Sequence, residues 1–472
     1  MPSSYAQAVT TAFGLLAHAL PFGYRFPLPI WVYVVAGGAA VLASAPAAAL
    51  AVTATPGRGW RSRNFYPRVR PLRLGTIGLG LTSILLLWGL VGAIGGRSDQ
   101  AHEFLENPLT VLVWVDLWVG LGLVSAFIGN VWDFVSPLNA AARAFDRALA
   151  RANVQPFPYP ARLGQWPAVV LLLWWSWAEL VWPSAKHPAT LALMTIVYFC
   201  ATLLGSALFG AEPWLGNVEV FTVFARTLGR FAPLELAPSS PEDWLAAQRE
   251  DREVRLRPYG TGLRSGDFPS GGSVFVVALL ATVVYDGFSQ TRKYARLVGW
   301  AVDRIGWFGA HGEMLATLLM LAIVVLFVAA FFAVCAAVER TAAGAREAVR
   351  RYAPTLIPIA AVYFAAHYFS YLLLAGQATL GVLVDPFGKS WNPGGLGEYQ
   401  IWLGLTPAVV VWWTQVVLIV TGHVAGVFAA HRVALRARGA VGALAAQVPL
   451  VILMVGYTIA GLWVLAQQIQ KA

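Results

Sequence analysis

The stretch from Leu315 to Val338 reads LATLLMLAIVVLFVAAFFAVCAAV and contains no charged side chain. It is longer than the about 20 apolar residues that an α-helix needs to cross the hydrocarbon core of a bilayer. Hydrophobic residues make up 58% of the chain and charged residues 12%. Because backbone polar groups inside a bilayer must bond to one another, such stretches form helices. The sequence therefore predicts an all-α, polytopic helical membrane bundle.

Similar apolar stretches recur along the chain and predict about ten transmembrane helices. The expected spans are 28–52, 74–94, 108–128, 166–182, 189–208, 273–288, 315–338, 354–376, 405–430 and 441–466. They divide the chain into an N-terminal interfacial or signal-like segment (1–27), five transmembrane helices (28–208), a cytoplasmic loop (209–272) and five last transmembrane helices (273–472). An outer loop rich in Gly and Pro is expected at 377–401.

The distribution of basic residues predicts the orientation of the chain. Arginines crowd the loop that follows the first span, from Arg58 to Arg73, and cytoplasmic loops carry such an excess. Alternation of the spans then places both termini outside a bacterial inner membrane. Two amphipathic stretches, 140–152 and 294–308, are expected to lie along the membrane surfaces as interfacial helices.

The net charge of +10 does not indicate a nucleic-acid partner. The basic residues form short tracts between apolar spans, where membrane topology accounts for them. The expected partners are therefore membrane lipid and other subunits of a membrane complex, with no nucleic acid. The two cysteines, Cys200 and Cys335, lie inside apolar spans and are interpreted as small packing residues.

Ionisable residues inside membrane spans are costly and often functional, so each one is a candidate. The candidates in or next to the expected spans are Asp116, Glu179, Glu219, Asp286, His367 and His423. Asp286 lies at a span end, where it could cap against interfacial water instead. Glu179 lies near an outer rim, where a snorkelling side chain is the simpler interpretation.

His367 and His423 are the strongest of these candidates. They lie in consecutive, antiparallel spans, and Tyr363 and Ser370 share the helix face of His367. Gly422 and Gly426 flank His423 and would let another helix approach closely. Two imidazoles on facing helices could share a divalent metal or a haem iron, or bond to a quinone carbonyl. The alternative is that each histidine donates to a backbone carbonyl and has a structural role.

Familiar catalytic motifs are absent from the sequence. It contains no Gly-rich phosphate loop, no HExxH, no CxxC or CxxCH, and no Gly-x-Ser-x-Gly elbow. A soluble cofactor-binding domain is therefore not expected.

Several short motifs resemble a family of bacterial multi-spanning membrane proteins that are commonly labelled fenitrothion hydrolase. The resembling segments follow one another along most of the chain: His18 with 26–31, 129–132 with 136–137, 286–288, 352–358, 366–370, 422–424 and 430–431. The resemblance implies hydrolysis of a lipophilic phosphorothioate triester. It also implies that His367, His423 and Asp286 act as metal ligands or general bases.

Three functions follow from these observations. The first is an integral membrane subunit of an electron-transfer or energy-converting assembly that binds a quinone or haem within the bundle. Its catalytic and cofactor-binding residues would be His367, His423 and Asp286, together with Tyr363 and Ser370. The alternatives are a membrane-embedded, metal-dependent hydrolase of organophosphorus esters and a transporter.

Overall fold

The computed structural model describes residues 29–53, 71–95, 103–238, 252–263, 268–339 and 342–469. Within this part of the chain, nine helices are long and apolar enough to cross a membrane, and the only sheet has two strands. The prediction of an all-α, multi-pass helical membrane protein is confirmed. The expected N-terminal segment, 1–27, and the arginine-rich stretch 58–70 lie outside the described residues.

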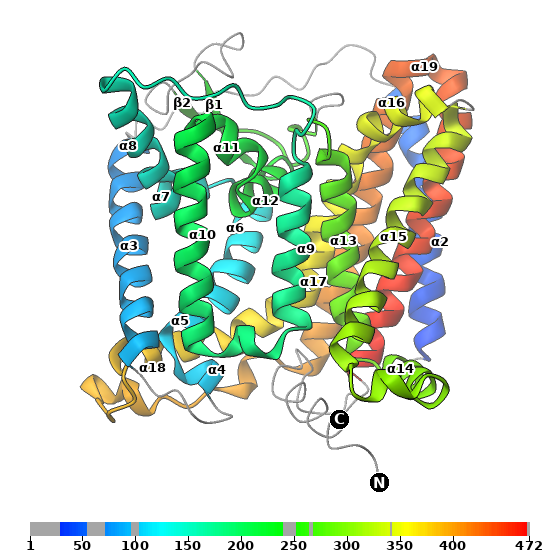
Figure 1. The fold of residues 1–472 in the computed structure, drawn as a ribbon. Coiled ribbons are helices and arrows are strands. Elements are labelled where there is room, and N and C mark those ends of the chain that lie inside the picture. Colours follow the sequence, from blue (N-terminus) through cyan, green and yellow to red (C-terminus); the bar gives the residue numbers. More distant parts are fainter. Residues whose placement is uncertain are drawn as a thin grey trace.

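Two of the membrane-crossing helices are each built from three consecutive elements, and α19 contains two crossing helices in one label. They are α2 (Ile30–Thr53), α3 (Pro71–Gly95), α5 (Pro108–Thr110) continuing into η1 (Val111–Gly120) and α6 (Leu121–Phe127), α10 (Pro188–Phe209), α13 (Gly272–Ser289), α15 (Gly312–Glu339), α16 (Ala342–Tyr352) continuing through η6 (Ala353–Leu356) into α17 (Ile357–Ala375), and the two halves of α19 (Ala408–Ile469). The two halves of α19 meet at Gly439, whose φ of 69° and ψ of −179° are essentially restricted to glycine. Helix α9 (Trp166–Leu180) has 15 residues and runs beside them across the bundle (Figure 1).

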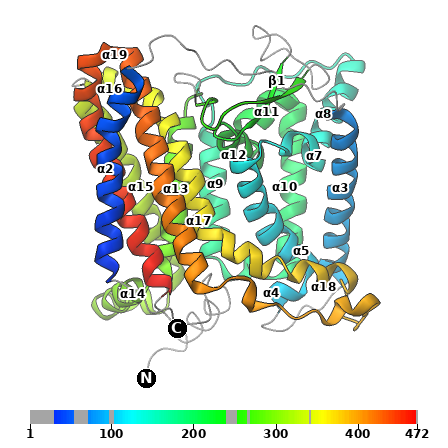
Figure 2. The same cartoon turned by 180° about the vertical axis from the view of Figure 1, so that it is seen from behind.

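The shorter elements lie at the two edges of the bundle (Figures 1 and 2). We call the edge where α2 begins and α19 ends the terminal edge, and the other the opposite edge. The terminal edge carries α4 (Glu103–Glu106), η2 (Pro183–Lys186), α14 (Arg292–Arg304), η5 (Gly306–Gly309), α18 (Ala378–Val384), η7 (Pro393–Glu398) and η8 (Leu403–Leu405). The opposite edge carries α7 (Trp132–Val135), α8 (Pro137–Arg151), α11 (Ala211–Asn217), α16 and an antiparallel pair, β1 (Leu234–Pro238) and β2 (Arg252–Leu256).

Helices α13 and α17 run through the centre of the bundle. In the most apolar 18-residue stretch of each helix, 78% of the residues are buried. The corresponding shares are 17% in α3 and 22% in α15, which lie at the periphery. A helix that is apolar on every side is buried in a protein core or faces lipid. Because α13 and α17 are enclosed by other helices, any polar group on them must find its partners inside the protein.

The structure differs from the predicted loop 209–272 in its first part. There α12 (Val220–Gly229) is a short apolar helix, buried along most of its length among α6, α9 and α17. Glu219 caps its N-terminus, and the carboxylate accepts hydrogen bonds from Thr222 N (2.7 Å) and from the Tyr198 hydroxyl (2.6 Å). Ten residues are too few to cross a bilayer, so span length alone missed this helix. Glu219, a candidate site residue, therefore has a capping role.

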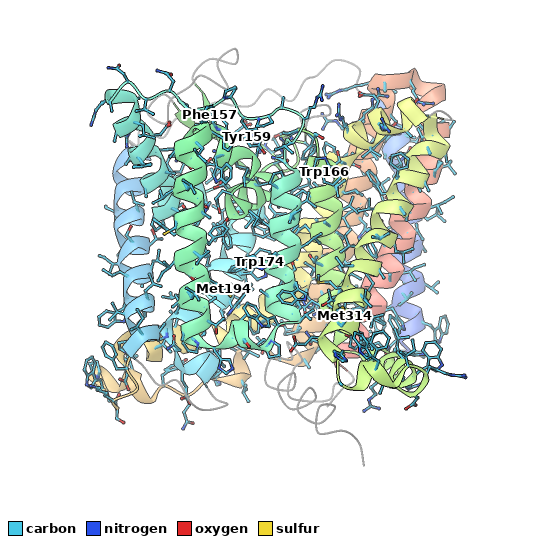
Figure 3. The ribbon with its side chains drawn as sticks, in the orientation of Figure 1. Phe157, Tyr159, Trp166, Trp174, Met194 and Met314 are labelled. Carbon is cyan, nitrogen blue, oxygen red and sulfur yellow. The ribbon has the colours of Figure 1, made fainter. Side chains whose placement is uncertain are left out.

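Tryptophans occupy both the centre and the edges of the protein. In the core, the Trp118 ring stacks on Phe224 with 4.9 Å between centroids and meets Phe364 edge-on at 5.9 Å. Trp166 lies toward the opposite edge and is 45% exposed (Figure 3). This edge position suits an interfacial aromatic belt, whereas the Trp118 stack holds η1, α12 and α17 together.

A network of four charges fastens α12 to the opposite edge. Arg226 of α12 binds both carboxylate oxygens of Asp133 on α7, at 3.0 and 3.1 Å. Arg143 of α8 lies 2.7 Å from Glu212 of α11, which also contacts Arg226. Burial opposes ionisation of Glu212, but the two guanidinium groups outweigh it and lower its pKa. The stability that Glu212 contributes is therefore present above its ordinary pKa and is lost as the pH falls through the lowered value.

The predicted close approach at Gly422 and Gly426 is confirmed. A Cβ atom on Gly422 would lie 2.0 Å from a Val362 methyl carbon, and one on Gly426 would lie 3.1 Å from the Thr355 carbonyl oxygen. The backbones of α17 and α19 can meet here only because these positions lack side chains.

Gly422→Ala is expected to destabilise the protein by about 2 kcal/mol, because the added methyl overlaps Val362 and must push α17 and α19 apart. Thermal unfolding in detergent would measure the change. Gly456→Ala on the same α19 is the matched control, since its Cβ would meet nothing within 4 Å. Alanine favours a helix over glycine by about 1 kcal/mol, so the control is expected to be neutral or stabilising. Equal melting temperatures for the two variants would contradict the packing argument.

Candidate functional site

A hydrogen-bonded cluster forms around the carboxylate of Asp286, in the last turn of α13. His367 Nε2 lies 2.8 Å from Asp286 Oδ2, and the Tyr368 hydroxyl donates to the same oxygen over 2.7 Å. Gln290 Nε2 donates to Asp286 Oδ1 over 2.9 Å. All four side chains are buried. We call this group the Asp286 cluster.

Two helices position the Asp286 cluster. Asp286 lies in the last turn of α13, and Gln290 is the residue that directly follows the helix, four positions later. His367 and Tyr368 are neighbours on α17, and their rings meet edge-on with 4.5 Å between centroids. Phe364, one turn earlier, packs against Tyr368 at 4.7 Å and limits its rotation. The cluster thus joins the two central helices of the bundle.

The chemistry of the Asp286 cluster follows from its burial. A buried carboxylate is costly unless donors surround it, and three side chains point nitrogen or oxygen atoms at Asp286. A carboxylate bonded to an imidazole orients the ring and stabilises it when it takes up a proton. The arrangement can therefore accept and return a proton inside an apolar bundle.

His423 lies outside this cluster. Its Nδ1 is 2.8 Å from the carbonyl oxygen of Ile419, one turn earlier on its own helix. Gln415 Nε2 bonds the carbonyl of Ala366, next to His367, over 3.0 Å. His423 is eight residues beyond Gln415, which is about 12 Å along the helix axis. The structure thus separates the two imidazoles that the sequence suggested as a pair.

The other predicted cofactor-binding residues are buried on α17. Tyr363 packs toward the second half of α19, where a Cβ on Gly461 would lie 2.8 Å from its ring. Its hydroxyl has no hydrogen-bond partner among the described residues. Ser370 lies one turn beyond His367 on the same helix. Neither residue is among the three that bond Asp286 through their side chains in the contacts described above.

Among the described residues, the predicted ligands do not form a metal centre. In the described part of the chain, no three His, Cys, Asp or Glu side chains converge as metal ligands. Of the predicted metal and catalytic residues, the structure brings together His367 and Asp286 only.

The two remaining candidate acids, Glu179 and Asp116, have different surroundings. Glu179 of α9 is close enough to interact electrostatically with Asp286 and with Lys186 of η2. Asp116 of η1 accepts a hydrogen bond from the Thr379 hydroxyl of α18 over 2.8 Å. The η1 segment is a π-helix of ten residues, an uncommon conformation that is frequent at functional sites.

Sequence reasoning missed Tyr368 and Gln290 as partners of Asp286. The expectation for His367 used positions three and four residues away, which share its helix face. Tyr368 directly follows His367, so its side chain leaves α17 in a different direction. Both side chains nevertheless reach Asp286 Oδ2. For Gln290, the spacing of four residues from Asp286 was the available signal.

A comparison of the chain with protein-family models, curated proteins and solved structures found no match in any of the three. Fold and site together define a multi-pass helical membrane protein with a hydrogen-bonded Asp–His–Tyr cluster between its two central helices.

Proposed function

We propose that the protein is an integral membrane subunit of an electron-transfer or energy-converting assembly, and that it binds a quinone head group beside the Asp286 cluster. The observation that carries the proposal is the buried pair of Asp286 and His367, joined by the Tyr368 hydroxyl. A quinone carbonyl needs a hydrogen-bond donor, and a quinol needs a base for its protons. An imidazole bonded to a carboxylate supplies both functions.

Aromatic rings next to the cluster supply contacts for a flat, apolar ring. Phe364 packs against both Tyr368 and Trp118, with centroid separations of 4.7 and 5.9 Å. Ligand sites of this kind combine an aromatic lining with a few placed polar groups.

The proposed orientation places the terminal edge outside a bacterial inner membrane. Arginines gather at the opposite edge, on α8, on α16 and around the turn of α19: Arg143, Arg147, Arg151, Arg346, Arg350, Arg351, Arg432, Arg436 and Arg438. The positive-inside rule assigns this edge to the cytoplasm. Helix α14 lies at the terminal edge (Figure 1), so the proposed orientation puts this basic helix outside.

Quinone binding is tested with His367→Gln and His423→Gln. Glutamine keeps a hydrogen-bonding group at each position but cannot act as a base like imidazole. His367→Gln is expected to weaken binding of a short-chain quinone about tenfold, the effect of one hydrogen bond. His423→Gln is expected to bind like the unmodified protein, because His423 bonds only its own helix in the contacts described above. Quenching of tryptophan fluorescence during titration measures both affinities.

Three outcomes of the same preparation would count against the proposal. Lipid extracts of the purified protein without stoichiometric quinone, together with no saturable quenching, would remove the quinone. Equal losses in both variants would show that the Asp286 cluster is not the binding site. A Soret band that shifts on reduction would replace the quinone with haem.

A hydrolase that uses the same pair is the second candidate. The observation that favours it is the orientation of His367 by Asp286, which resembles a general base and its positioning carboxylate. In this case the substrate would be a lipophilic phosphorothioate triester and His367 would activate water. Release of a nitrophenol by the pure protein, with and without divalent metal, tests this candidate. No turnover under either condition would exclude it.

A further inference from the structure

A second set of polar side chains lies between the Asp286 cluster and the terminal edge. Glu179 is next to the last residue of α9, and Lys186 ends the short helix η2 at that edge. Glu179 interacts electrostatically with both Asp286 and Lys186, and Lys186 also interacts with Asp286. Both side chains lie in a partly buried region. They form a charged connection from the centre of the bundle toward its surface.

A buried hydrogen-bond donor without a partner indicates a binding position for water or a polar ligand atom beside these two side chains. The indole N–H of Trp118 is fully buried and has no hydrogen-bond partner among the described residues. It lies near the Glu179 carboxyl and the Tyr368 hydroxyl without bonding either in ordinary geometry. Buried donors are nearly always paired, so an orphaned one marks a position for water or a ligand atom. Water held there would link Glu179 to the Asp286 cluster.

The groups around Glu179 come from several elements. Asp286 faces it from α13, Lys186 from η2, Trp118 from η1, and both Tyr368 and Tyr371 from α17. Asp116 is a further acid near Tyr371, but its carboxylate is bonded to Thr379.

Lys186 is suited to exchange protons near neutral pH. Burial lowers the pKa of Lys186 to about 8, while the carboxylates of Glu179 and Asp286 act in the opposite direction. An ammonium group with this pKa releases and regains its proton in the working range of pH, unlike an ordinary lysine.

We propose that Glu179 and Lys186 form a proton path between the Asp286 cluster and the aqueous phase at the terminal edge. A proton leaves the His367–Asp286 pair through water beside Trp118 and protonates the Glu179 carboxylate. Glu179 then passes a proton to the neutral Lys186 amine, which releases it to bulk water. Each step transfers one proton from the donor to the acceptor and transfers no electrons. The reverse sequence loads the cluster from the same edge.

The proposed path extends the proposed function, because quinone chemistry at the cluster would then exchange its protons with one side of the membrane only. The path itself does not require a bound quinone, because it begins at the Asp286 cluster. Its test therefore follows protonation of the cluster and not turnover.

The test is a pH jump on the intact protein, followed by time-resolved infrared spectroscopy. The carboxyl band of Asp286 is assigned by its disappearance in Asp286→Asn. Glu179→Gln is expected to slow the response of this band at least tenfold, and Lys186→Met to slow it as well. Glu179→Asp, which restores an acid, is expected to recover much of the rate. Asp116→Asn is the matched control, since it removes an acid that is bonded elsewhere.

The outcomes separate the path from the quinone proposal. Unchanged band kinetics in Glu179→Gln would overturn the path, and equal slowing by Asp116→Asn would show a general electrostatic effect instead. Glu179→Gln is expected to bind quinone with the affinity of the unmodified protein. If no quinone binds any variant but the band still requires Glu179, the path stands and the quinone proposal fails.

Discussion

Asp286→Asn is expected to lower quinone affinity about a hundredfold. The substitution removes the negative charge that orients His367 and makes it a proton acceptor. Hydrogen bonds to a charged group contribute about 1.5–3 kcal/mol, and a hundredfold loss corresponds to about 2.7 kcal/mol. The variant is expected to bind less well than His367→Gln, because it removes the charge of the cluster and not one hydrogen bond. Fluorescence titration with a short-chain quinone measures the difference.

Asparagine is a suitable replacement because the surrounding side chains can still pair with it. Its carbonyl oxygen can accept from His367 and Tyr368, as Oδ2 of Asp286 does. Its amide N–H can then meet Gln290 Oε1, which has no partner among the described residues, after rotation of the Gln290 amide. The fold is therefore expected to survive, and a melting temperature near that of the unmodified protein would confirm this.

Asp116→Asn is the matched control for Asp286→Asn, because it neutralises an acid bonded to Thr379. Unchanged quinone affinity in Asp286→Asn, or an equal loss in Asp116→Asn, would place the binding site elsewhere.

Arg226→Ala is expected to destabilise the protein by about 3 kcal/mol, the size of effect seen when one partner of a buried ion pair is removed. Asp133 would lose a guanidinium that contacts both of its carboxylate oxygens. Asp133 is buried and would keep only the more distant Arg143, at 3.5 Å, and Asn130 among the contacts described here. Because α12 carries Arg226, its packing against α6 and α17 would weaken as well.

Thermal unfolding and protease resistance in detergent measure the effect of Arg226→Ala. Arg147→Ala is the matched control, because Arg147 is an exposed arginine on α8 at the same edge. Combining Arg226→Ala with Asp133→Asn is expected to recover part of the loss, since it removes the buried negative charge that Arg226 neutralises. If Arg226→Ala melted like Arg147→Ala, the four-charge network would contribute nothing to stability.

The membrane-crossing helices could be predicted because hydropathy is a local and additive property. The run Leu315 to Val338 became α15, Gly312–Glu339, with almost the same ends. Helix α12 could not be found this way, because it is apolar but only ten residues long. Its cap, Glu219, is local, but its burial depends on packing among α6, α9 and α17 and on the ion pair of Arg226 with Asp133, and these partners come from other parts of the chain.

The candidate site could be predicted in part. The rule that ionisable residues in a membrane are rare and meaningful selected Asp286 and His367, which the structure brings into contact. The same rule also selected His423, which bonds its own helix. The rule identifies buried polar groups, but it contains no information about which of them meet.

By itself, the sequence determined that this protein folds in a lipid bilayer. It also determined the approximate ends of most membrane-crossing helices and the few polar groups that these helices carry into the bilayer. Only the tertiary structure decided that Asp286 pairs with His367 and Tyr368, and that Glu179 lies beside them. The physical reason is rotational. A helix that is apolar on every side, as α13 and α17 nearly are, has no polar face to set its rotation about its own axis. That rotation depends on close packing with neighbouring helices and on the need to pair each buried polar group.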